Sequence, residues 1–214
     1  MDLDVHHGDG VEFAFAHTKK VITLSFHVFE PGFFPGTGSG EDKERGGKER
    51  GAYNVPMQRD TKAPVWEETV KRGVTMVWEK YNPDCLVLQC GCDGIYPLDS
   101  VNPGLLTDPH HGMQLTSYSF QSVVSYILDL AKVPKLILGG GGYHPPSTAK
   151  TFALLTGVIL GKELDEDIPL DAQYWEELEK DGGIHVGRDT KMPPGGEEEI
   201  ERLCTALKER LENH

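Results

Sequence analysis

The sequence predicts an α/β fold in which helices cover both faces of a parallel β-sheet. Three short runs of apolar and β-branched residues support this prediction: KVITLSF at 20–26, CLVLQC at 85–90 and KLILGG at 135–140. Segments with a helical spacing of apolar residues lie between and after them. Strands that are apolar throughout are buried on both faces, which is typical of parallel sheets. With 214 residues, the chain is long enough for one hydrophobic core, so we expect a single domain.

Three helices are expected in the middle of the chain. Pro64 begins the first one, in which valines recur at helical spacing. The second is expected at about 113–131. The third is expected at 147–161, with Ser147 as its N-cap and Gly161 at its end.

Two further segments complete the predicted organisation. The Gly-rich, charged stretch GTGSGEDKERGGKERG at 36–51 is typical of a mobile surface loop within a domain. Residues 168–214 form a C-terminal extension that ends in a helix. That helix has an apolar stripe, and three glutamates at 197–199 lie in its first turn, where the helix dipole favours them.

The composition narrows the classes of partner. The chain has 21 Lys and Arg residues against 34 Asp and Glu residues, which gives a formal charge of −13. A basic face is needed for direct nucleic-acid binding, so we expect none. No apolar run approaches the ~20 residues of a membrane helix, and no disulfide framework is evident among the 4 cysteines. We therefore expect a soluble, intracellular protein without a membrane partner.

The motif DLDVHHGDG at 2–10 concentrates metal-ligand residues in a strand-like frame. In a strand, alternate side chains share a face, so Asp2, Asp4 and His6 are expected on one side and His7 on the other. Asp93, just past the apolar run at 85–90, can supply a third ligand, because sites form beyond the carboxyl ends of parallel strands. Two carboxylates and one imidazole leave a position open on Zn²⁺, as in catalytic zinc sites. A polar strand end with capping roles is the alternative.

Two other polar motifs have simpler interpretations. Cys90 and Cys92 lack a second cysteine pair, so we interpret them as small buried apolar residues. The DPHHG motif at 108–112, which contains His110 and His111, is more typical of a solvated turn that enters a helix.

Four glycines at 139–142 follow an apolar run and precede Tyr143. Glycines allow unusual backbone angles and close approach to a bound group, so we expect this loop to hold the Tyr143 phenol over such a group. A phosphate-binding loop is the alternative, but the Lys-Ser/Thr pair that would follow is absent.

The chain resembles the zinc-dependent histone deacetylases, most of all those of class I. Four motifs carry the resemblance in order: DLDVHHGDG at 2–10, PGFFPGTG at 31–38, LQCGCDG at 88–94 and LILGGGGY at 136–143. The likeness extends to about Gly161 and is thin beyond Ile168. It implies an arginase/deacetylase-type fold, of which 1–214 would be the C-terminal part of one catalytic domain.

The resemblance also implies roles for individual residues. The zinc ligands would be Asp4, His6 and Asp93. Tyr143 would be the catalytic residue that hydrogen-bonds the acetyl carbonyl and its oxyanion. The remaining roles fall to Phe33 and Phe34 as walls of the acyl-lysine channel, and to Asp2 and Asp9 as carboxylates that orient a histidine pair.

Potassium is a second implied cofactor. One K⁺ would lie close to the zinc segment, and its ligands would come from Asp2, Asp4, His6, Ser25 and Phe26. A more remote K⁺ would use carbonyl oxygens of Phe15, Thr18 and Val21.

The implied function is zinc-dependent hydrolysis of N-acetyl-lysine in histones or other proteins. The implied location is the nucleus, with the cytoplasm as a second site, and a corepressor complex is an expected partner. Deacetylation of a small acetylated amine such as a polyamine is an alternative. A non-catalytic module that holds zinc is another.

The histidine pair that serves as general base in this family precedes the zinc motif, which here begins at residue 2. We therefore expect the N-terminal part of the fold to be missing and activity to be impaired. We also expect the segment 2–5 to form an unpaired edge of the sheet, which would favour association.

Overall fold

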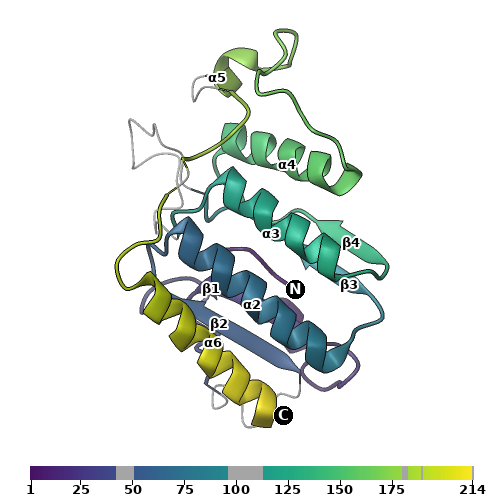
Figure 1. The fold of residues 1–214 in the computed structure, drawn as a ribbon, viewed down its shortest axis with the longest axis vertical. Coiled ribbons are helices and arrows are strands. Elements are labelled where there is room, and N and C mark those ends of the chain that lie inside the picture. Colours follow the sequence, from purple (N-terminus) through teal and green to yellow (C-terminus); the bar gives the residue numbers. More distant parts are fainter. Residues whose placement is uncertain (42–50, 96–112, 180–182, 189, 214) are drawn as a thin grey trace.

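A computed structural model of the chain describes residues 1–41, 51–95, 113–179, 183–188 and 190–213 (Figure 1). Most of the predicted mobile loop at 36–51 lies outside these ranges, as does the DPHHG motif with His110 and His111. Within the described residues, no helix has both the length and the apolar character needed to cross a membrane.

Among the described residues, four strands form two parallel pairs. β1 (Thr23–Val28) pairs with β2 (Ala52–Met57), and β3 (Leu86–Gln89) pairs with β4 (Lys135–Leu138). The predicted runs at 20–26, 85–90 and 135–140 each contain one of the strands, and all of the described pairing is parallel. The predicted α/β class with a parallel sheet is confirmed.

The N-terminal segment joins the two pairs. Asp2 forms bridges with both Ser25 on β1 and Gln89 on β3. Its backbone N–H donates to Leu24 (2.8 Å), and the next N–H, that of Leu3, donates to Gln89 (3.0 Å). The spatial order is therefore β2, β1, N-terminal segment, β3, β4. The expectation of an unpaired edge at 2–5 is wrong, because this segment lies in the middle of the sheet.

The segment 2–5 is central because its apolar side chains complete the core. Leu3 and Val5 are both fully buried. In the described part of the chain, β2 and β4 are the outer strands, so the open edges of the sheet lie there instead.

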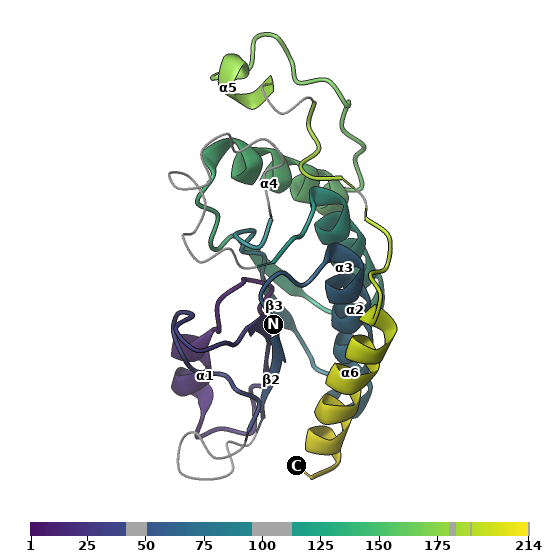
Figure 2. The same cartoon turned by 90° about the vertical axis from the view of Figure 1, so that its left-hand side faces the viewer.

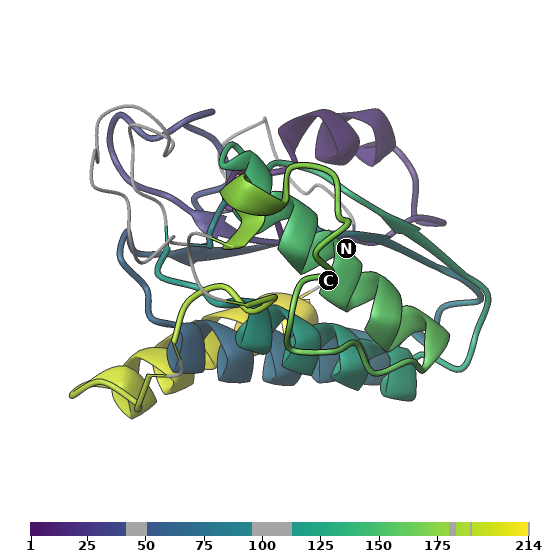
Figure 3. The ribbon, with the colours of Figure 1, turned by 90° about the horizontal axis from the view of Figure 1, so that it is seen from above.

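The described ranges contain six helices, with the bounds α1 (Asp9–Phe15), α2 (Ala63–Tyr81), α3 (Ser117–Leu130), α4 (Pro145–Leu160), α5 (Trp175–Glu179) and α6 (Gly196–Asn213). Figures 2 and 3 show α2, α3 and α6 side by side on one face of the strands and α1 on the opposite face. The predicted placement of helices on both faces is confirmed.

Two predicted helix starts need correction. The second helix begins at Ser117, not near 113, because the Thr116 side chain and Ser119 form a capping box there. The helix predicted to start after Ser147 begins three residues earlier, at Pro145, with His144 as its N-cap. The predicted end at Gly161 is confirmed, since Gly161 takes a left-handed conformation after the last turn.

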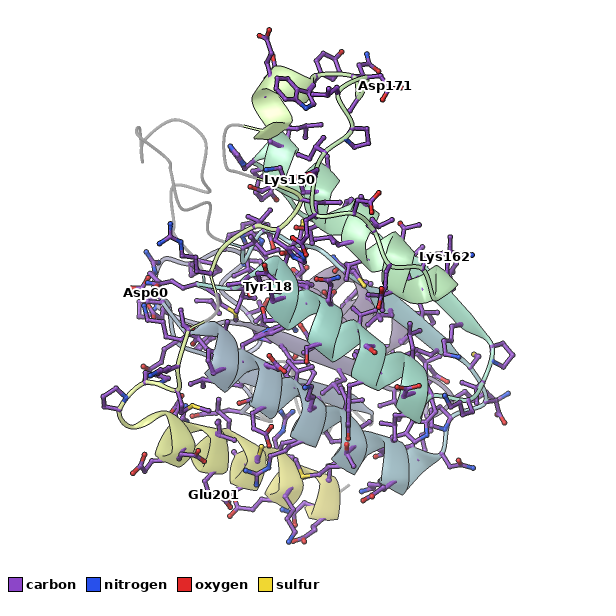
Figure 4. All side chains as sticks on the ribbon, turned by 45° about the horizontal axis from the view of Figure 1, so that its top comes forward. Asp60, Tyr118, Lys150, Lys162, Asp171 and Glu201 are labelled. Carbon is purple, nitrogen blue, oxygen red and sulfur yellow. The ribbon has the colours of Figure 1, made fainter. Side chains whose placement is uncertain are left out.

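The core lies between the strands and the row formed by α2, α3 and α6. Its largest buried side chains include Phe26 from β1, Trp66 from α2 and Phe120 from α3. On the outer surface, Glu201 of α6 accepts a hydrogen bond from Arg72 of α2 at 2.9 Å (Figure 4). This packing leaves the carboxyl ends of the central strands free to carry polar side chains.

Candidate metal centre

Asp4, His6 and Asp93 converge at the end of the central strands. One ligand atom from each residue lies within 4.8 Å of those of the other two. His6 Nδ1 is 2.9 Å from Asp93 Oδ2 and 3.1 Å from Asp4 Oδ1. Within the described ranges, this is the group of His, Cys, Asp and Glu side chains whose atoms could hold a metal ion.

The backbone that presents Asp4 and His6 is bent. Asp2 is the only residue of the segment in a β-bridge, and residues 4–6 form bends. The Asp4 N–H donates to Asp2 Oδ1, and the His6 N–H donates to Asp4 Oδ1, each at 3.0 Å. Short Asp side chains often stabilise such local turns. The expectation of a continuous strand is therefore wrong, and the turns aim His6 Nδ1 at the carboxylates.

Backbone and side-chain donors fix the two carboxylates. The Val5 N–H donates to Asp93 Oδ1 at 2.9 Å. Asp4 Oδ2 accepts from Gln89 Nε2 and from the Gly141 N–H, each at 2.9 Å. The side-chain oxygen of Gln89, Oε1, in turn accepts from the Gly91 N–H at 2.7 Å. Gln89 is not among the predicted site residues, although a lone amide at the end of an apolar strand is a signal that could have indicated it.

The glycines around the site make room for these carboxylates. A Cβ on Gly91 would lie 2.8 Å from Asp4 Cγ, and a Cβ on Gly141 would lie 2.6 Å from Asp93 Cγ. Among the glycines at 139–142, only Gly142 has a positive φ, at +152°. The glycine run therefore allows close packing. The predicted unusual backbone angles occur at Gly142 alone among these four glycines.

The ionisation of Asp4 and Asp93 depends on the hydrogen bonds that both carboxylates form with His6. Burial disfavours an imidazolium, but the hydrogen bonds to Asp4 and Asp93 outweigh it and raise the pKa of His6 to about 10. Burial, with the Asp4 charge nearby, raises the pKa of Asp93 to about 6. Burial also opposes ionisation of Asp4, but hydrogen bonds from His6 and Gln89 prevail and lower its pKa. Two buried carboxylates that attract one positive charge are a suitable site for a divalent cation.

Three aromatic side chains surround the His6 ring. Phe33 stacks on it at a centroid distance of 5.3 Å, whereas Phe34 and Tyr143 meet it edge-on at 5.7 and 6.5 Å. Phe33 is only 3% exposed, while Phe34 is 68% exposed and Tyr143 is also exposed. We call residues 30–38 the aromatic loop. Phe34 and Tyr143 are thus the aromatic groups available to a ligand beside the cluster.

Asp2 precedes His6 and His7 in the sequence, and Asp9 follows them. Burial raises the pKa of Asp2 to about 6, and its carboxylate lies against Gly8. Asp9 is the first residue of α1, and its N–H donates to the His7 carbonyl at 2.8 Å. Neither contact shows a histidine pair being oriented, so that role stays a prediction.

The residues predicted to hold potassium fall into two groups. Asp2 and Ser25 are bridge partners, so the first group is assembled around the N-terminal segment. The Ser25 hydroxyl is 2.8 Å from His27 Nδ1. In the second group, the Thr18 N–H donates to the Phe15 carbonyl at 3.1 Å, directly after α1. Both predicted potassium sites, including the ligands expected from Phe26 and Val21, stay predictions.

Cys90 and Cys92 are buried free thiols. Burial raises the pKa of Cys90 to about 12 and that of Cys92 to about 11, which keeps both groups neutral at physiological pH. Their interpretation as small buried residues outside the ligand set is confirmed.

Comparison with known proteins identifies the family. Residues 1–159 match the histone deacetylase domain. The chain belongs to the histone deacetylase family. It is 34% identical over 211 residues to histone deacetylase 8 of Xenopus tropicalis, covering 99% of this chain and 54% of that protein. It is 32% identical over 213 residues to histone deacetylase RPD3 of Saccharomyces cerevisiae, covering 100% of this chain and 46% of that protein.

The chain spans about half the length of the curated relatives that it matches. Membership of the family confirms the predicted resemblance and implies the arginase/deacetylase fold and a metal cofactor. Asp4, His6 and Asp93 fit a metal ion, since each offers one ligand atom and these three atoms lie within 4.8 Å of one another.

Proposed function

We propose that the domain to which this chain belongs hydrolyses N-acetyl-lysine in histones or other proteins with Zn²⁺ as cofactor. The convergence of Asp4, His6 and Asp93 carries the proposal. Two carboxylate oxygens and one imidazole nitrogen are the ligand types and the number that catalytic zinc sites use. Zn²⁺ held there would polarise the acetyl carbonyl and lower the pKa of the attacking water.

Tyr143 supplies the hydrogen bond to the oxygen that gains charge during attack. Its ring lies across from His6 at 6.5 Å, and its side chain is exposed to an incoming ligand. A preorganised donor at that position stabilises an oxyanion by a few kcal/mol, about 10²–10³ in turnover.

Phe34 provides the apolar surface along which the substrate enters. Its exposed ring lies edge-on to His6, while Phe33 packs beneath as a fixed support. An apolar wall suits the methylene chain of acetyl-lysine, which carries no charge once acetylated.

The names of the relatives support a proposal for the substrate class and the cellular setting. Similar proteins are named histone deacetylases. We therefore assign acetylated histone tails or other acetyl-lysine proteins as substrates, the nucleus as the main location, and a corepressor complex as a partner. Residues 1–214 would be part of one catalytic domain with 168–214 as its C-terminal extension, and K⁺ would support the segment around Ser25.

Turnover by this chain alone should be slow. In the part of the chain that the structure describes, His6 is the one histidine in the cluster, and it is committed to the metal. A general base contributes typically 10²–10⁴-fold, so a site served by no second histidine would turn over more slowly by about that factor.

The test is a deacetylase assay on the purified chain with an acetyl-lysine peptide and with an acetylated polyamine, with and without a chelator. The proposal expects slow, chelator-sensitive hydrolysis of the peptide that Tyr143→Phe lowers by about 10²-fold without loss of bound zinc. Tyr118→Phe, on α3, is the matched control. Equal turnover by Tyr143→Phe and wild type would remove Tyr143 from the mechanism, and preference for the polyamine would change the substrate class.

A second candidate is a non-catalytic module that holds zinc. The observation in its favour is the same single histidine in the described cluster. Stoichiometric zinc binding together with no chelator-sensitive hydrolysis of either substrate would support this candidate over the enzyme.

A further inference from the structure

Two buried histidines lie beneath the aromatic loop. His7 and His27 are both buried, and their ring centroids are 4.5 Å apart. His7 Nδ1 lies 2.8 Å from the Thr37 hydroxyl, and His27 Nε2 lies 2.9 Å from the Gly38 carbonyl oxygen. The two rings therefore hold the loop at two successive residues.

The far side of each ring is also bonded, which fixes its orientation. His7 Nε2 lies 2.8 Å from Glu12 Oε2, an oxygen that also accepts from Asn54 Nδ2 at 2.7 Å. A carboxylate only accepts, so His7 Nε2 carries the proton and its Nδ1 accepts from the Thr37 hydroxyl when the ring is neutral. His27 Nε2 donates to a carbonyl oxygen, and its Nδ1 faces the Ser25 hydroxyl at 2.8 Å.

Gly38 brings the loop backbone directly onto the two rings. A Cβ at this position would lie 2.7 Å from His7 Cγ and 2.8 Å from His27 Cε1. Its φ is +87°, a left-handed conformation. Gly32, at the other end of the aromatic loop, has a similar φ of +83°, but a Cβ there would meet nothing within 4 Å. The close contact at Gly38 is thus specific to the histidines.

The same loop carries the aromatic residues of the candidate metal centre. Phe33 stacks on His6, the neighbour of His7 in the chain, and Phe34 meets the same ring edge-on. His6 and His7 therefore act from opposite sides of one backbone: one faces the cluster and the other holds the loop that encloses it.

We infer that His7 and His27 are positioning residues, which set the aromatic loop against His6 and hold Phe34 at the entrance to the metal cluster. The relevance of this position to acetyl-lysine recognition rests on the proposed function, but the anchoring itself does not. Loss of either contact should release Phe34 while the metal ligands remain in place.

The test uses the whole chain with 4-fluorophenylalanine incorporated at position 34 and observed by ¹⁹F NMR. Thr37→Val removes the hydroxyl that faces His7 and keeps the side-chain shape, whereas Thr37→Ser keeps the hydroxyl. Gly38→Ala pushes on both rings, whereas Gly32→Ala imposes a similar backbone strain without that contact. We expect a single sharp resonance in wild type, Thr37→Ser and Gly32→Ala, and a shifted or broadened one in Thr37→Val and Gly38→Ala.

Zinc binding, measured in parallel, should be retained in all four variants. An unchanged resonance in Thr37→Val, or equal changes in Gly38→Ala and Gly32→Ala, would overturn the inference. If circular dichroism shows that Gly38→Ala does not fold, the comparison of Thr37→Val with Thr37→Ser tests the inference. Failure of the deacetylase assay would leave these spectra unaffected, so the two proposals are tested separately.

Discussion

At the scale of single residues, the orientation of the Asp4 carboxylate depends on Gln89. The Gln89 amide donates to Asp4 Oδ2 at 2.9 Å, and its carbonyl is itself held by the Gly91 N–H at 2.7 Å. A residue that orients a metal ligand in this way contributes to affinity without touching the metal.

Gln89→Leu should therefore weaken zinc binding. The substitution keeps the size of the side chain and removes its donor, which leaves Asp4 Oδ2 with the Gly141 N–H as its remaining partner at that oxygen. Loss of such a partner typically costs 10–100-fold in metal affinity, so we expect a weakening of about that factor. Competition with a fluorescent zinc chelator measures it.

Gln121→Leu on α3 is the matched control, because this glutamine is remote in sequence and lies on a different element. Equal zinc affinities for Gln89→Leu and wild type would show that Gln89 does not orient the ligand.

The ligand residues were predictable, whereas their supports were not. Asp4, His6 and Asp93 carry their chemistry in their side chains, and the strand-end position of Asp93 was enough to bring it toward the other two. The bends at residues 4–6 and the donor from Gln89 depend on tertiary contacts between β3 and the N-terminal segment. Such contacts leave no periodic signal in the sequence.

At the scale of elements, α6 forms part of the main core. Leu203, Leu207 and Leu211 belong to the same buried cluster as the strands and α2. Gly73 of α2 makes this close packing possible, since a Cβ there would lie 3.0 Å from Phe26 and 3.2 Å from Leu207. The stripe predicted for the last helix thus marks the face that α6 buries.

Leu207→Ala should destabilise the whole domain. Leu207 is buried, and its removal would leave a cavity between α6 and α2. Leu→Ala substitutions in cores cost about 2–5 kcal/mol in the free energy of unfolding. Urea denaturation followed by circular dichroism measures the loss.

Leu170→Ala is the control, because Leu170 is strongly exposed and a surface substitution usually changes stability by less than about 0.5 kcal/mol. A change as small in Leu207→Ala as in Leu170→Ala would mean that α6 does not contribute to the core in solution.

The helices α1 and α5 and the strand β2 escaped prediction, and α5 has only 5 residues. α1 has 7 residues, too few for a helical period to stand out. β2 contains Pro56, which argues against a strand in the interior of a sheet. In the described residues β2 lies at the end of the strand order, where proline is tolerated because no further ladder needs its N–H.

At the scale of the whole molecule, β2 and β4 are the outer strands of the described sheet, and β4 combines an unpaired edge with exposed apolar side chains. Leu136 and Leu138 alternate on one face of β4, and Val87 of β3 is the register partner of Leu136. All of them are exposed, with Leu136 at 54%. The position of this open edge could not be predicted, because the order of strands in space differs from their order along the chain.

An open edge beside an exposed apolar face should make the purified chain self-associate. Unpaired backbone groups and apolar side chains on one strand favour pairing with another copy. We expect the average mass measured by light scattering to rise with protein concentration. The double substitution Leu136→Glu with Leu138→Glu should suppress this rise, because it places charges on the exposed face and they would repel one another in a paired edge.

Ile159→Glu, at an exposed apolar position of α4, tests whether any added charge has the same effect. If only the β4 substitutions suppress association while zinc binding is retained, the contact runs through the β4 edge of the sheet. A monomeric wild-type chain at all concentrations, or equal suppression by Ile159→Glu, would contradict this prediction.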